Sequence, residues 1–437
     1  MLNTANLSLE QAPPISIPLR FFLTAPLFGI GAGLCMLFFG PDILLSRWNS
    51  ITLSNSHMIT LGMLAMVMCG AMLQMLPVVA GSPVPGVVTV GTAVHLLLGM
   101  GTVFLAVGFV QVGTIWMQLA LVALGSGFGL FILGIGIALL RVSFPSYTVT
   151  GMRVAVVALA VTVTLGVLLV GGVSGLWKMD FLVHLADIHL GWGVFGWIGL
   201  LVIGVSYQVV PMFHVTPEYP LWIRRVLTLC IFVFTLAWSL LEVLGWFGVE
   251  TGIPSDFVLL ALISGFLLFV ILTFRLILRR KRKVPDITLM FWHTGLLSAV
   301  VAFAVWLSGR LGGVEYPVFV GLLVLVGCAL SLVNGMLYKI VPFLSWFHLQ
   351  NRQMALMNMS VTVPHMKAFV PDKRAKRQFY LHLAALVLMV GAVFLPGWLS
   401  QLGGALFALS NLVLLSNLAL AVRLYRQTEL SLQVSSP

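Results

Sequence analysis

Charged residues are scarce in this sequence. Asp, Glu, Lys and Arg together make up 8% of the 437 residues. Roughly a quarter of the residues are charged in an ordinary soluble domain. Hydrophobic residues make up 60% of the chain. This composition excludes an ordinary soluble domain and indicates a polytopic membrane protein, for which the lipid bilayer is the first expected partner.

Cysteine is also rare, and the four cysteines form no C-x-x-C or C-x-x-C-H pattern. Their spacing therefore supports neither covalent haem attachment nor a zinc ribbon, and we interpret Cys35, Cys69, Cys230 and Cys328 as small packing residues. The first 20 residues lack the short apolar core and the small-residue cleavage site of a signal peptide. We expect them to form a retained cytoplasmic tail.

Twelve segments are long and apolar enough to cross a bilayer, which takes about 20 residues. They are residues 22–45, 56–80, 88–110, 114–140, 154–176, 184–212, 226–248, 256–278, 287–309, 316–346, 379–398 and 401–423. Each must be helical, because lipid offers the backbone no hydrogen-bond partner. The sequence therefore predicts an all-α polytopic membrane protein with a single membrane domain over residues 1–437.

Basic residues are distributed unevenly among the predicted loops. If the N-terminus is inside, only Arg47, Lys178 and Arg310 lie outside, and the other 20 of the 23 Lys and Arg residues lie toward the inside. This is the positive-inside bias of membrane proteins. It predicts cytoplasmic N- and C-termini in the inner (cytoplasmic) membrane of a bacterium. We interpret the basic runs as anchors at the inner leaflet and expect no nucleic-acid partner.

One motif occurs three times along the chain. Its frame is Gly, seven residues, Gly, three residues, a polar residue, two residues and Pro. The copies, 134 and 131 residues apart, are Gly62, Gly70, Gln74 and Pro77; Gly196, Gly204, Gln208 and Pro211; and Gly327, Gly335, Lys339 and Pro342. They fall on predicted helices 2, 6 and 10. The sequence therefore predicts three four-helix pseudo-repeats, at about residues 20–145, 150–280 and 285–425, and one long cytoplasmic loop at 347–378.

Two histidines lie near the outer ends of repeat helices. His57 opens helix 2, two residues from the position that His189 occupies in helix 6. Because both helices run inward, both imidazoles should lie at similar depth, where they could ligate haem iron or copper. His184 is a further candidate ligand, and Asp187 could hydrogen-bond its ring. The alternative is that these histidines are interfacial and bond to backbone or headgroups. Four others fall in or near the inner loops: His214, His348, His365 and His382.

A second group of polar residues recurs toward the cytoplasmic side. Gln74, Gln208 and Lys339 share one position of the repeat. Polar groups within a span are costly, so a proton or ion path is one interpretation. The other is that these side chains satisfy backbone groups freed by the prolines three residues later. Glu242, between Trp238 and Trp246 on helix 7, is a separate candidate, either as a proton site or as a partner of the outer histidines.

The whole pattern resembles subunit I of the haem–copper oxidase superfamily. The likeness consists of twelve helices in three four-helix arcs, with histidines at the outer ends of helices 2 and 6. It is closest to the cbb3-type oxidases, the nitric oxide reductases and the NnrS-like membrane proteins. The resemblance implies that His57 is an axial ligand of a haem b and that His189, or else His184, is a copper ligand.

The chain also departs from this family. The family's helix 10 carries a His-x-His pair, but residues 316–323 contain no histidine. The adjacent histidine pair of helix 7 is missing too, and helix 7 offers Trp238, Glu242 and Trp246 instead. A working centre that reduces oxygen or nitric oxide is therefore not expected. What remains is a single haem on His57, a copper site, or a fold that has lost its metals.

Three functions are compatible with these features. The first is a haem- or copper-binding protein of respiratory or nitric oxide metabolism, with other respiratory subunits or a redox donor as partners. The second is a secondary transporter without a redox cofactor, with Lys339 and Glu242 as candidate residues, although most transporter folds show two-fold repeats. The third is a metal-free assembly or scaffold protein. His95 and His293, on helices 3 and 9, would form a second haem site only if those helices touch.

Overall fold

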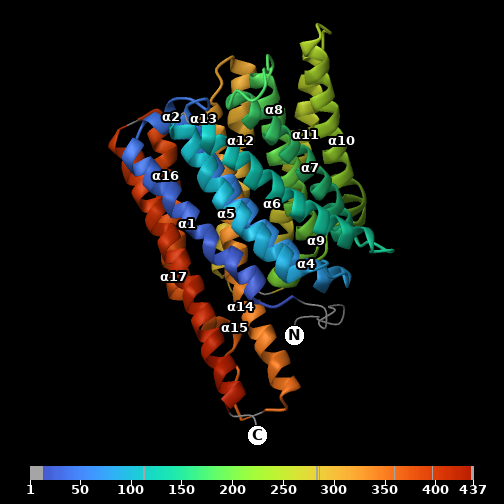
Figure 1. The fold of residues 1–437 in the computed structure, drawn as a ribbon, viewed down its shortest axis with the longest axis vertical. Coiled ribbons are helices and arrows are strands. Elements are labelled where there is room, and N and C mark those ends of the chain that lie inside the picture. The colour runs from blue at the N-terminus through green and yellow to red at the C-terminus, as the bar shows by residue number, and fades with distance from the viewer. Residues whose placement is uncertain are drawn as a thin grey trace. The chain divides into compact units, whose positions relative to one another are not determined.

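The computed structural model describes residues 13–111, 114–281, 284, 286–358, 360–395 and 397–434 (Figure 1). Every regular element within these residues is a helix, and none is a strand. Twelve of the described helices are long and apolar enough to cross a membrane. The prediction of an all-α, multi-pass membrane protein is confirmed.

The chain forms two compact units. The middle unit contains residues 71–283, and the flanking unit contains residues 14–70 and 284–437. The middle unit consists of the end of α4 (Met66–Ala80), α5 (Val87–Gln111), α6 (Thr114–Leu140), α7 (Tyr147–Val173), α8 (Leu182–Gly191), η2 (Trp192–Gly199), α9 (Leu200–His214), α10 (Leu221–Trp246) and α11 (Gly252–Leu278). The flanking unit consists of α1 (Ser16–Phe39), α2 (Asp42–Leu45), α3 (Ser50–His57), η1 (Met58–Ala65), the start of α4, α12 (Ile287–Gly312), α13 (Pro317–Leu322), η3 (Leu323–Leu330), α14 (Ser331–Ala355), α15 (Met366–Phe369), α16 (Asp372–Phe394) and α17 (Trp398–Val434).

Several helices extend beyond the apolar segments from which they were predicted. Helices α1, α7 and α16 begin six or seven residues early, at Ser16, Tyr147 and Asp372. These added turns, which are strongly polar only in α16, continue the helix because backbone hydrogen bonds close within it whether or not lipid surrounds it. Helix α14 likewise runs on to Ala355. The connection predicted at 347–378 is therefore shortened to residues 356–371, which include α15.

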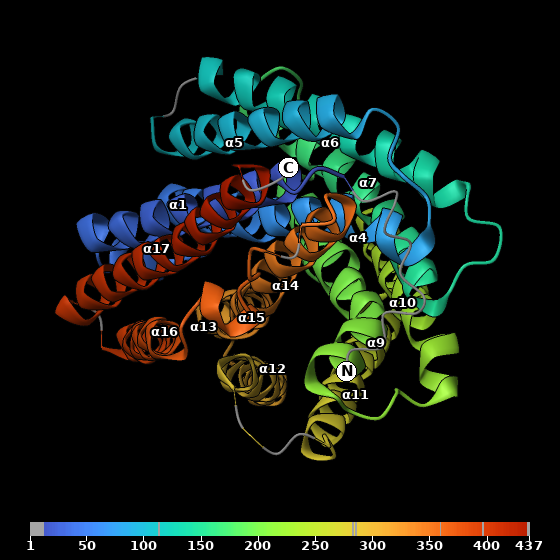
Figure 2. The same ribbon diagram turned by 90° about the horizontal axis from the view of Figure 1, so that it is seen from below.

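In the flanking unit, α1 and α17 lie side by side, and α16 packs against α17 (Figures 1 and 2). Small residues permit this approach. A Cβ atom on Gly33 of α1 would lie 2.5 Å from the backbone nitrogen of Ala408, and a Cβ on Gly404 would lie 2.7 Å from the Gly33 carbonyl. Glycine at such contacts lets two helix backbones touch, which is a common way for helices to associate in membranes.

In the middle unit, α5 packs against α6, and α7 contacts both α6 and α9 (Figure 2). The closest approach joins α7 and α9, where a Cβ on Gly151 would lie 2.6 Å from the Cα of Gly204. Arg153 follows on α7 and donates hydrogen bonds of 2.8 and 2.7 Å to the carbonyls of Leu139 and Val142. Arg153 therefore caps the end of α6.

A π-helical segment surrounds the first glycine of each copy of the repeated motif. The three segments are η1, η2 and η3, each eight residues long. Each begins four residues before the first glycine of its motif and ends three residues after it. Such segments are rare inside α-helices and are frequent at functional sites. The three motifs therefore share a backbone conformation as well as a sequence frame.

The π segment explains why the two glycines of the motif lie eight residues apart. On a regular α-helix, residues eight apart differ in direction by about 80°, and residues seven apart by only about 20°. A π turn adds one residue. Both glycines consequently face the preceding span, where their contacts are seven residues apart: Phe28 and Phe21, Ala158 and Gly151, and Ser298 and Phe291.

The helix pairs that carry the motif are thus built alike. The second glycine of each motif shows the same kind of contact, since a Cβ on Gly70 would lie 2.6 Å from Phe21 and one on Gly335 would lie 2.9 Å from Phe291. This likeness covers spans 1 and 2, 5 and 6, and 9 and 10. The larger grouping into three four-helix pseudo-repeats stays a prediction, as does the single membrane domain.

Candidate functional site

His57 is the last residue of α3 and directly precedes η1. Its side chain is half-buried, and its Nδ1 lies 2.8 Å from the carbonyl oxygen of Leu53. Because a carbonyl oxygen only accepts hydrogen bonds, Nδ1 carries the proton of the neutral ring and Nε2 carries the lone pair. This arrangement suits a histidine that ligates a metal through Nε2.

His189 has the same ring geometry in the middle unit. It lies on α8, three residues before η2 begins. Its Nδ1 is 3.0 Å from the carbonyl oxygen of Thr162 on α7, and a Cβ on Gly166 would lie 3.2 Å from its Cε1. The Nδ1 proton is therefore fixed here too, although by a neighbouring helix and not by the residue's own helix.

The other predicted copper ligand lies against a different helix. His184 is exposed, and its ring centre is 5.9 Å from that of Trp246 on α10, which also stacks on Phe181. Within the described ranges, no group of three or more His, Cys, Asp or Glu side chains is placed to hold a metal ion. His184, Asp187 and His189 do not form such a group, and the copper site stays a prediction.

Glu242 joins two helices of the middle unit. The hydroxyl of Ser255 on α11 donates a hydrogen bond of 2.6 Å to Glu242 Oε1 on α10. The carboxylate is half-buried and lies one turn before Trp246. Its contact ties α11 to α10 near the turn between them. A role for Glu242 in proton transfer stays a prediction.

The polar residues at the third position of the repeat differ in their surroundings. Gln74 is buried and Gln208 is half-buried, and Oε1 of Gln74 has no hydrogen-bond partner among the described residues. Lys339 has a defined partner, because its Nζ lies 2.5 Å from Asp286 Oδ2. Both side chains are only about one-fifth exposed, at 22% and 20%. The other Asp286 oxygen accepts from the Leu289 N–H at 3.1 Å and caps α12.

The flanking unit also contains polar side chains that the sequence analysis missed as a group. Three hydrogen bonds of 2.9 Å join α14, α16 and α17: Ser331 with His382, Gln378 with Ser410, and Asn417 with Tyr338. We call these six residues the polar cluster. Each of them is at most 6% exposed. Buried polar groups inside a membrane unit are costly and mark candidate functional positions.

The spacing of the polar cluster is visible in the sequence once the helices are known. Gln378 and His382 are four residues apart, and Ser410 and Asn417 are seven apart, so each pair shares one helix face. The sequence predicts His382 in or near an inner loop, because the apolar segment that contains it begins only at residue 379. Helix α16 instead begins at Asp372 and carries His382 into the interior.

The remaining candidates lie in separate units or are packing residues. His95 lies on α5 of the middle unit and His293 on α12 of the flanking unit, and both are half-buried. A second haem site between them stays a prediction. All four cysteines are free, Cys69 buried and the others half-buried.

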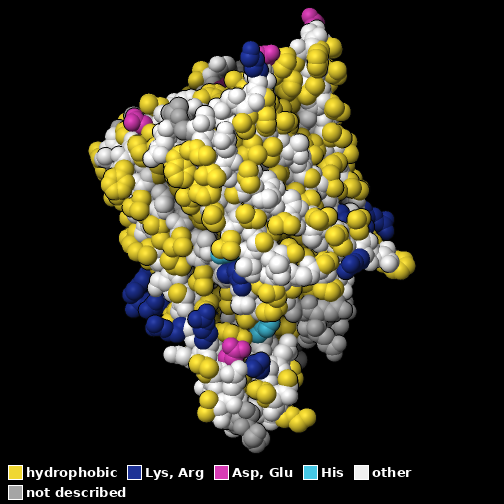
Figure 3. Space-filling view, viewed as in Figure 1, with side chains coloured by type: hydrophobic (Ala, Val, Ile, Leu, Met, Phe, Trp, Pro, Cys, Tyr) yellow, Lys and Arg dark blue, Asp and Glu magenta, His cyan; other side chains and the backbone are white. Residues whose placement is uncertain are grey.

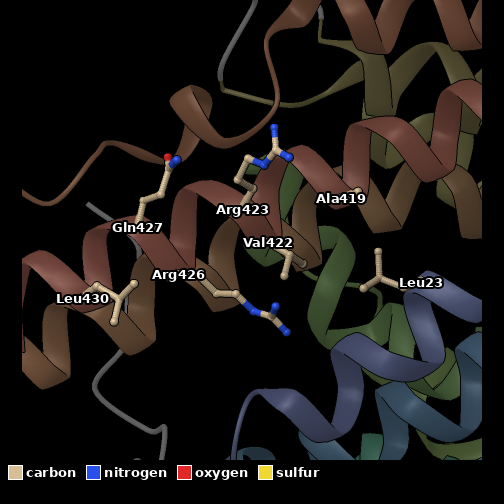
Figure 4. A pocket seen from close by; sticks show the side chains of 7 residues that line it. All are labelled: Leu23, Ala419, Val422, Arg423, Arg426, Gln427 and Leu430. Atoms are coloured by element: carbon tan, nitrogen blue, oxygen red, sulfur yellow. The ribbon is translucent and has the colours of Figure 1, made fainter.

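A surface cavity of about 380 Å³ lies between α17 and the start of α1. Its lining residues on α17 are Ala419, Val422, Arg423, Arg426, Gln427 and Leu430, and Leu23 lines it from α1 (Figure 4). The α17 residues recur every three or four positions, so they form one stripe along the helix. The cavity combines an apolar wall with two arginines.

No protein-family model matches this chain, and no curated protein matches it. What the fold defines is a class: a multi-pass, all-α membrane protein with twelve spans and a motif repeated three times. The particular function is therefore proposed from the geometry of its polar residues.

Proposed function

We propose that this chain is a divergent relative of haem–copper oxidase subunit I that holds a single haem through His57 and acts in respiratory or nitric oxide metabolism. The observation that carries the proposal is the Nδ1 contact of His57 with the Leu53 carbonyl, which leaves the lone pair on Nε2. His57 also stands directly before a π segment. The three repeated helix pairs, each with a π segment, also support a relationship to haem–copper oxidase subunit I.

The residues suit one axial ligand better than a complete catalytic centre. A haem iron held by histidine transfers single electrons or binds a diatomic gas. Helices 7 and 10 lack the histidines that a binuclear centre requires. Sensing of a gas such as nitric oxide, or electron transfer, therefore fits this chain better than reduction of a gas.

The setting of the proposal is the inner membrane of a bacterium. The 20 basic residues on one predicted side, against three on the other, favour cytoplasmic N- and C-termini. His57 then lies toward the outer face, where a redox donor or another respiratory subunit would reach it.

The test is an optical spectrum of the detergent-purified protein, oxidised and then reduced with dithionite, together with iron and copper assays on the same sample. The expected result is a Soret band with reduced α and β bands at one haem per chain. His57→Ala should lose these bands and His184→Ala should keep them. If nitric oxide binds at the iron, its addition should shift the Soret band.

Two outcomes would overturn the haem proposal. The first is that protein produced with ample haem and copper contains neither at stoichiometric level. The second is that the haem bands survive in His57→Ala. Copper without haem would move attention to His189 and His184. Unchanged cellular function after replacement of both His57 and His189 would favour a scaffold.

A second candidate function is a proton-coupled secondary transporter, which the polar cluster favours. Its hydrogen bonds lie in the same unit as the Lys339–Asp286 ion pair, and Tyr338 directly precedes Lys339. Such residues could pass or store a proton within the membrane. Purified protein in vesicles containing a pH-sensitive dye should then dissipate an imposed pH gradient, and His382→Phe should stop it. Equal rates in empty vesicles would exclude this function.

A further inference from the structure

The cavity between α17 and α1 has the chemistry of a lipid-headgroup site. Leu23, Val422 and Leu430 provide apolar surface, and Arg423 and Arg426 provide positive charge. Figure 4 shows the Arg426 side chain extending into the space between the two helices, with Leu23 on the opposite side, whereas the Arg423 side chain extends to the other side of α17. An amphipathic pocket of this kind suits a ligand with an anionic head and an apolar body.

Neither arginine is neutralised by another described residue of the protein. Both are exposed, and no ion pair joins them to a carboxylate in the described part of the chain. Glu429 is the one acidic residue of α17, and it faces other partners. The Tyr425 hydroxyl donates to Glu429 at 3.0 Å, and Arg352 lies 3.8 Å from it. The cavity therefore retains its positive charge.

The position of the cavity along the helices matches the border of the hydrocarbon. Arg423 and Arg426 are the first charged residues after the long apolar part of α17. Leu23 lies in the second turn of α1, where that span begins. On the face drawn in Figure 3, Lys and Arg side chains of the flanking unit lie below a mostly apolar surface. The phosphate of a phospholipid would meet the arginines at this depth while the acyl chains of that phospholipid stay in the hydrocarbon.

The two helices also have a reason to separate there. They touch through Gly33, Gly404 and Ala408 in the second half of α1. Toward the start of α1, the contact surfaces are the larger Leu23 and Val422, and α17 runs on past that point to Val434. The cavity lies beside α17 at the level of Leu23, where these larger side chains replace the glycine contacts.

We propose that this cavity, formed by Leu23, Val422, Arg423, Arg426 and Leu430, binds the headgroup of an anionic phospholipid. Arginine is well suited to a phosphate because its planar guanidinium donates two parallel hydrogen bonds. A zwitterionic lipid would place its own ammonium or choline cation near the arginines, so anionic lipids bind better. This site is independent of the proposed haem site.

The test compares lipids bound to the full-length protein by native mass spectrometry, with phosphatidylglycerol, cardiolipin and phosphatidylcholine each added to the detergent. The wild type should retain phosphatidylglycerol or cardiolipin in preference to phosphatidylcholine. R423Q/R426Q should bind the anionic lipids roughly tenfold to thirtyfold more weakly, because each basic residue near a membrane surface contributes to lipid binding. L23W, which narrows the cavity and keeps both charges, should also lower binding.

The matched control is R374Q/R377Q on α16, which removes two exposed arginines of the same unit at the same spacing. It should change binding less than twofold. Equal losses in both double variants would show that general charge attraction acts, and would overturn the site. Unchanged binding in both R423Q/R426Q and L23W would also overturn it. Displacement of the lipid by inorganic phosphate alone would show a simple anion site and contradict the lipid assignment.

Discussion

The two units of this protein bury polar groups in different ways. In the middle unit, Thr102 and Thr235 hydrogen-bond to carbonyls four residues earlier on their own helices, at 2.7 and 2.8 Å. In the flanking unit, the hydrogen bonds of the polar cluster link residues on different helices. The middle unit also joins elements through separate polar pairs, such as Trp192 with Ser239 and Ser255 with Glu242. The flanking unit differs in joining three helices, α14, α16 and α17, through one set of buried side chains.

This difference separates packing from candidate chemistry. Where two helices of the middle unit approach most closely, no side chain intervenes between Gly151 and Gly204. The middle unit also satisfies Trp192 through Ser239 at 2.9 Å, and Tyr219 through Thr273 at 2.8 Å. Burial raises the pKa of the Tyr219 phenol, so this hydroxyl stays neutral and serves as an anchor. The flanking unit contains the fully buried His382 and the Lys339–Asp286 ion pair. The middle unit has a buried histidine too, His214, and its Arg224–Glu218 pair leaves the glutamate side chain exposed.

The largest expected effect is a packing effect in the middle unit. Gly204→Val would place side-chain atoms within the backbone of α7, since a Cβ at residue 204 would lie 2.9 Å from the Cα of Gly151. Backbone atoms cannot move aside as the end of a side chain can, so we expect the free energy of unfolding to fall by about 3 kcal/mol or more. The measurement is the thermal unfolding midpoint and the monodisperse fraction in detergent. Gly129→Val is the control, because nothing lies within 4 Å of a Cβ there. Equal stability of the two variants would contradict this packing.

The second effect concerns the ion pair of the flanking unit. Lys339→Met removes the Lys339 ammonium group from the Asp286 carboxylate. Loss of one partner of a fully buried pair costs about 3–5 kcal/mol. We expect the free energy of unfolding to fall by about 2 kcal/mol in Lys339→Met, because both side chains are about one-fifth exposed. Adding Asp286→Asn should restore most of the stability, since Asn removes the charge and still caps α12. If the double variant is no more stable than Lys339→Met, the pair is not the cause.

A smaller effect is expected within the polar cluster. Asn417→Leu removes the donor to the Tyr338 hydroxyl. Hydrogen bonds between membrane helices contribute about 0.6 kcal/mol on average and up to about 1.7. A double-mutant cycle with Tyr338→Phe, measured by unfolding in mixed detergents, should return a coupling energy in that range. A coupling energy of zero would mean that the two side chains do not interact.

The smallest effect belongs to the middle unit. Thr235→Val keeps the shape of the side chain and removes only a hydroxyl that bonds to the Ile231 carbonyl of its own helix. We expect the free energy of unfolding to fall by less than about 0.5 kcal/mol, because the Ile231 carbonyl keeps its backbone hydrogen bond. Unfolding under the conditions used for Asn417→Leu gives the comparison. A larger loss in Thr235→Val than in Asn417→Leu would reverse the contrast between the units.

The sequence by itself determined the class of fold and the repeated motif. Twelve apolar segments predicted twelve spans, because a bilayer leaves the backbone only one way to satisfy its hydrogen bonds within a segment of that length. The frame of Gly62, Gly70, Gln74 and Pro77 was likewise readable in all three copies. Both are local properties, of composition and of spacing along the chain.

Only the tertiary structure decided what the motif and the polar residues contact. The eight-residue glycine spacing became intelligible through η1, η2 and η3 and the residues they face. The partner of Lys339 proved to be Asp286, 53 residues away, and His382 proved to bond Ser331, 51 residues away. No local rule connects residues at such separations, because their meeting depends on which helices pack together. The polar residues were visible in the sequence, and their partners were not.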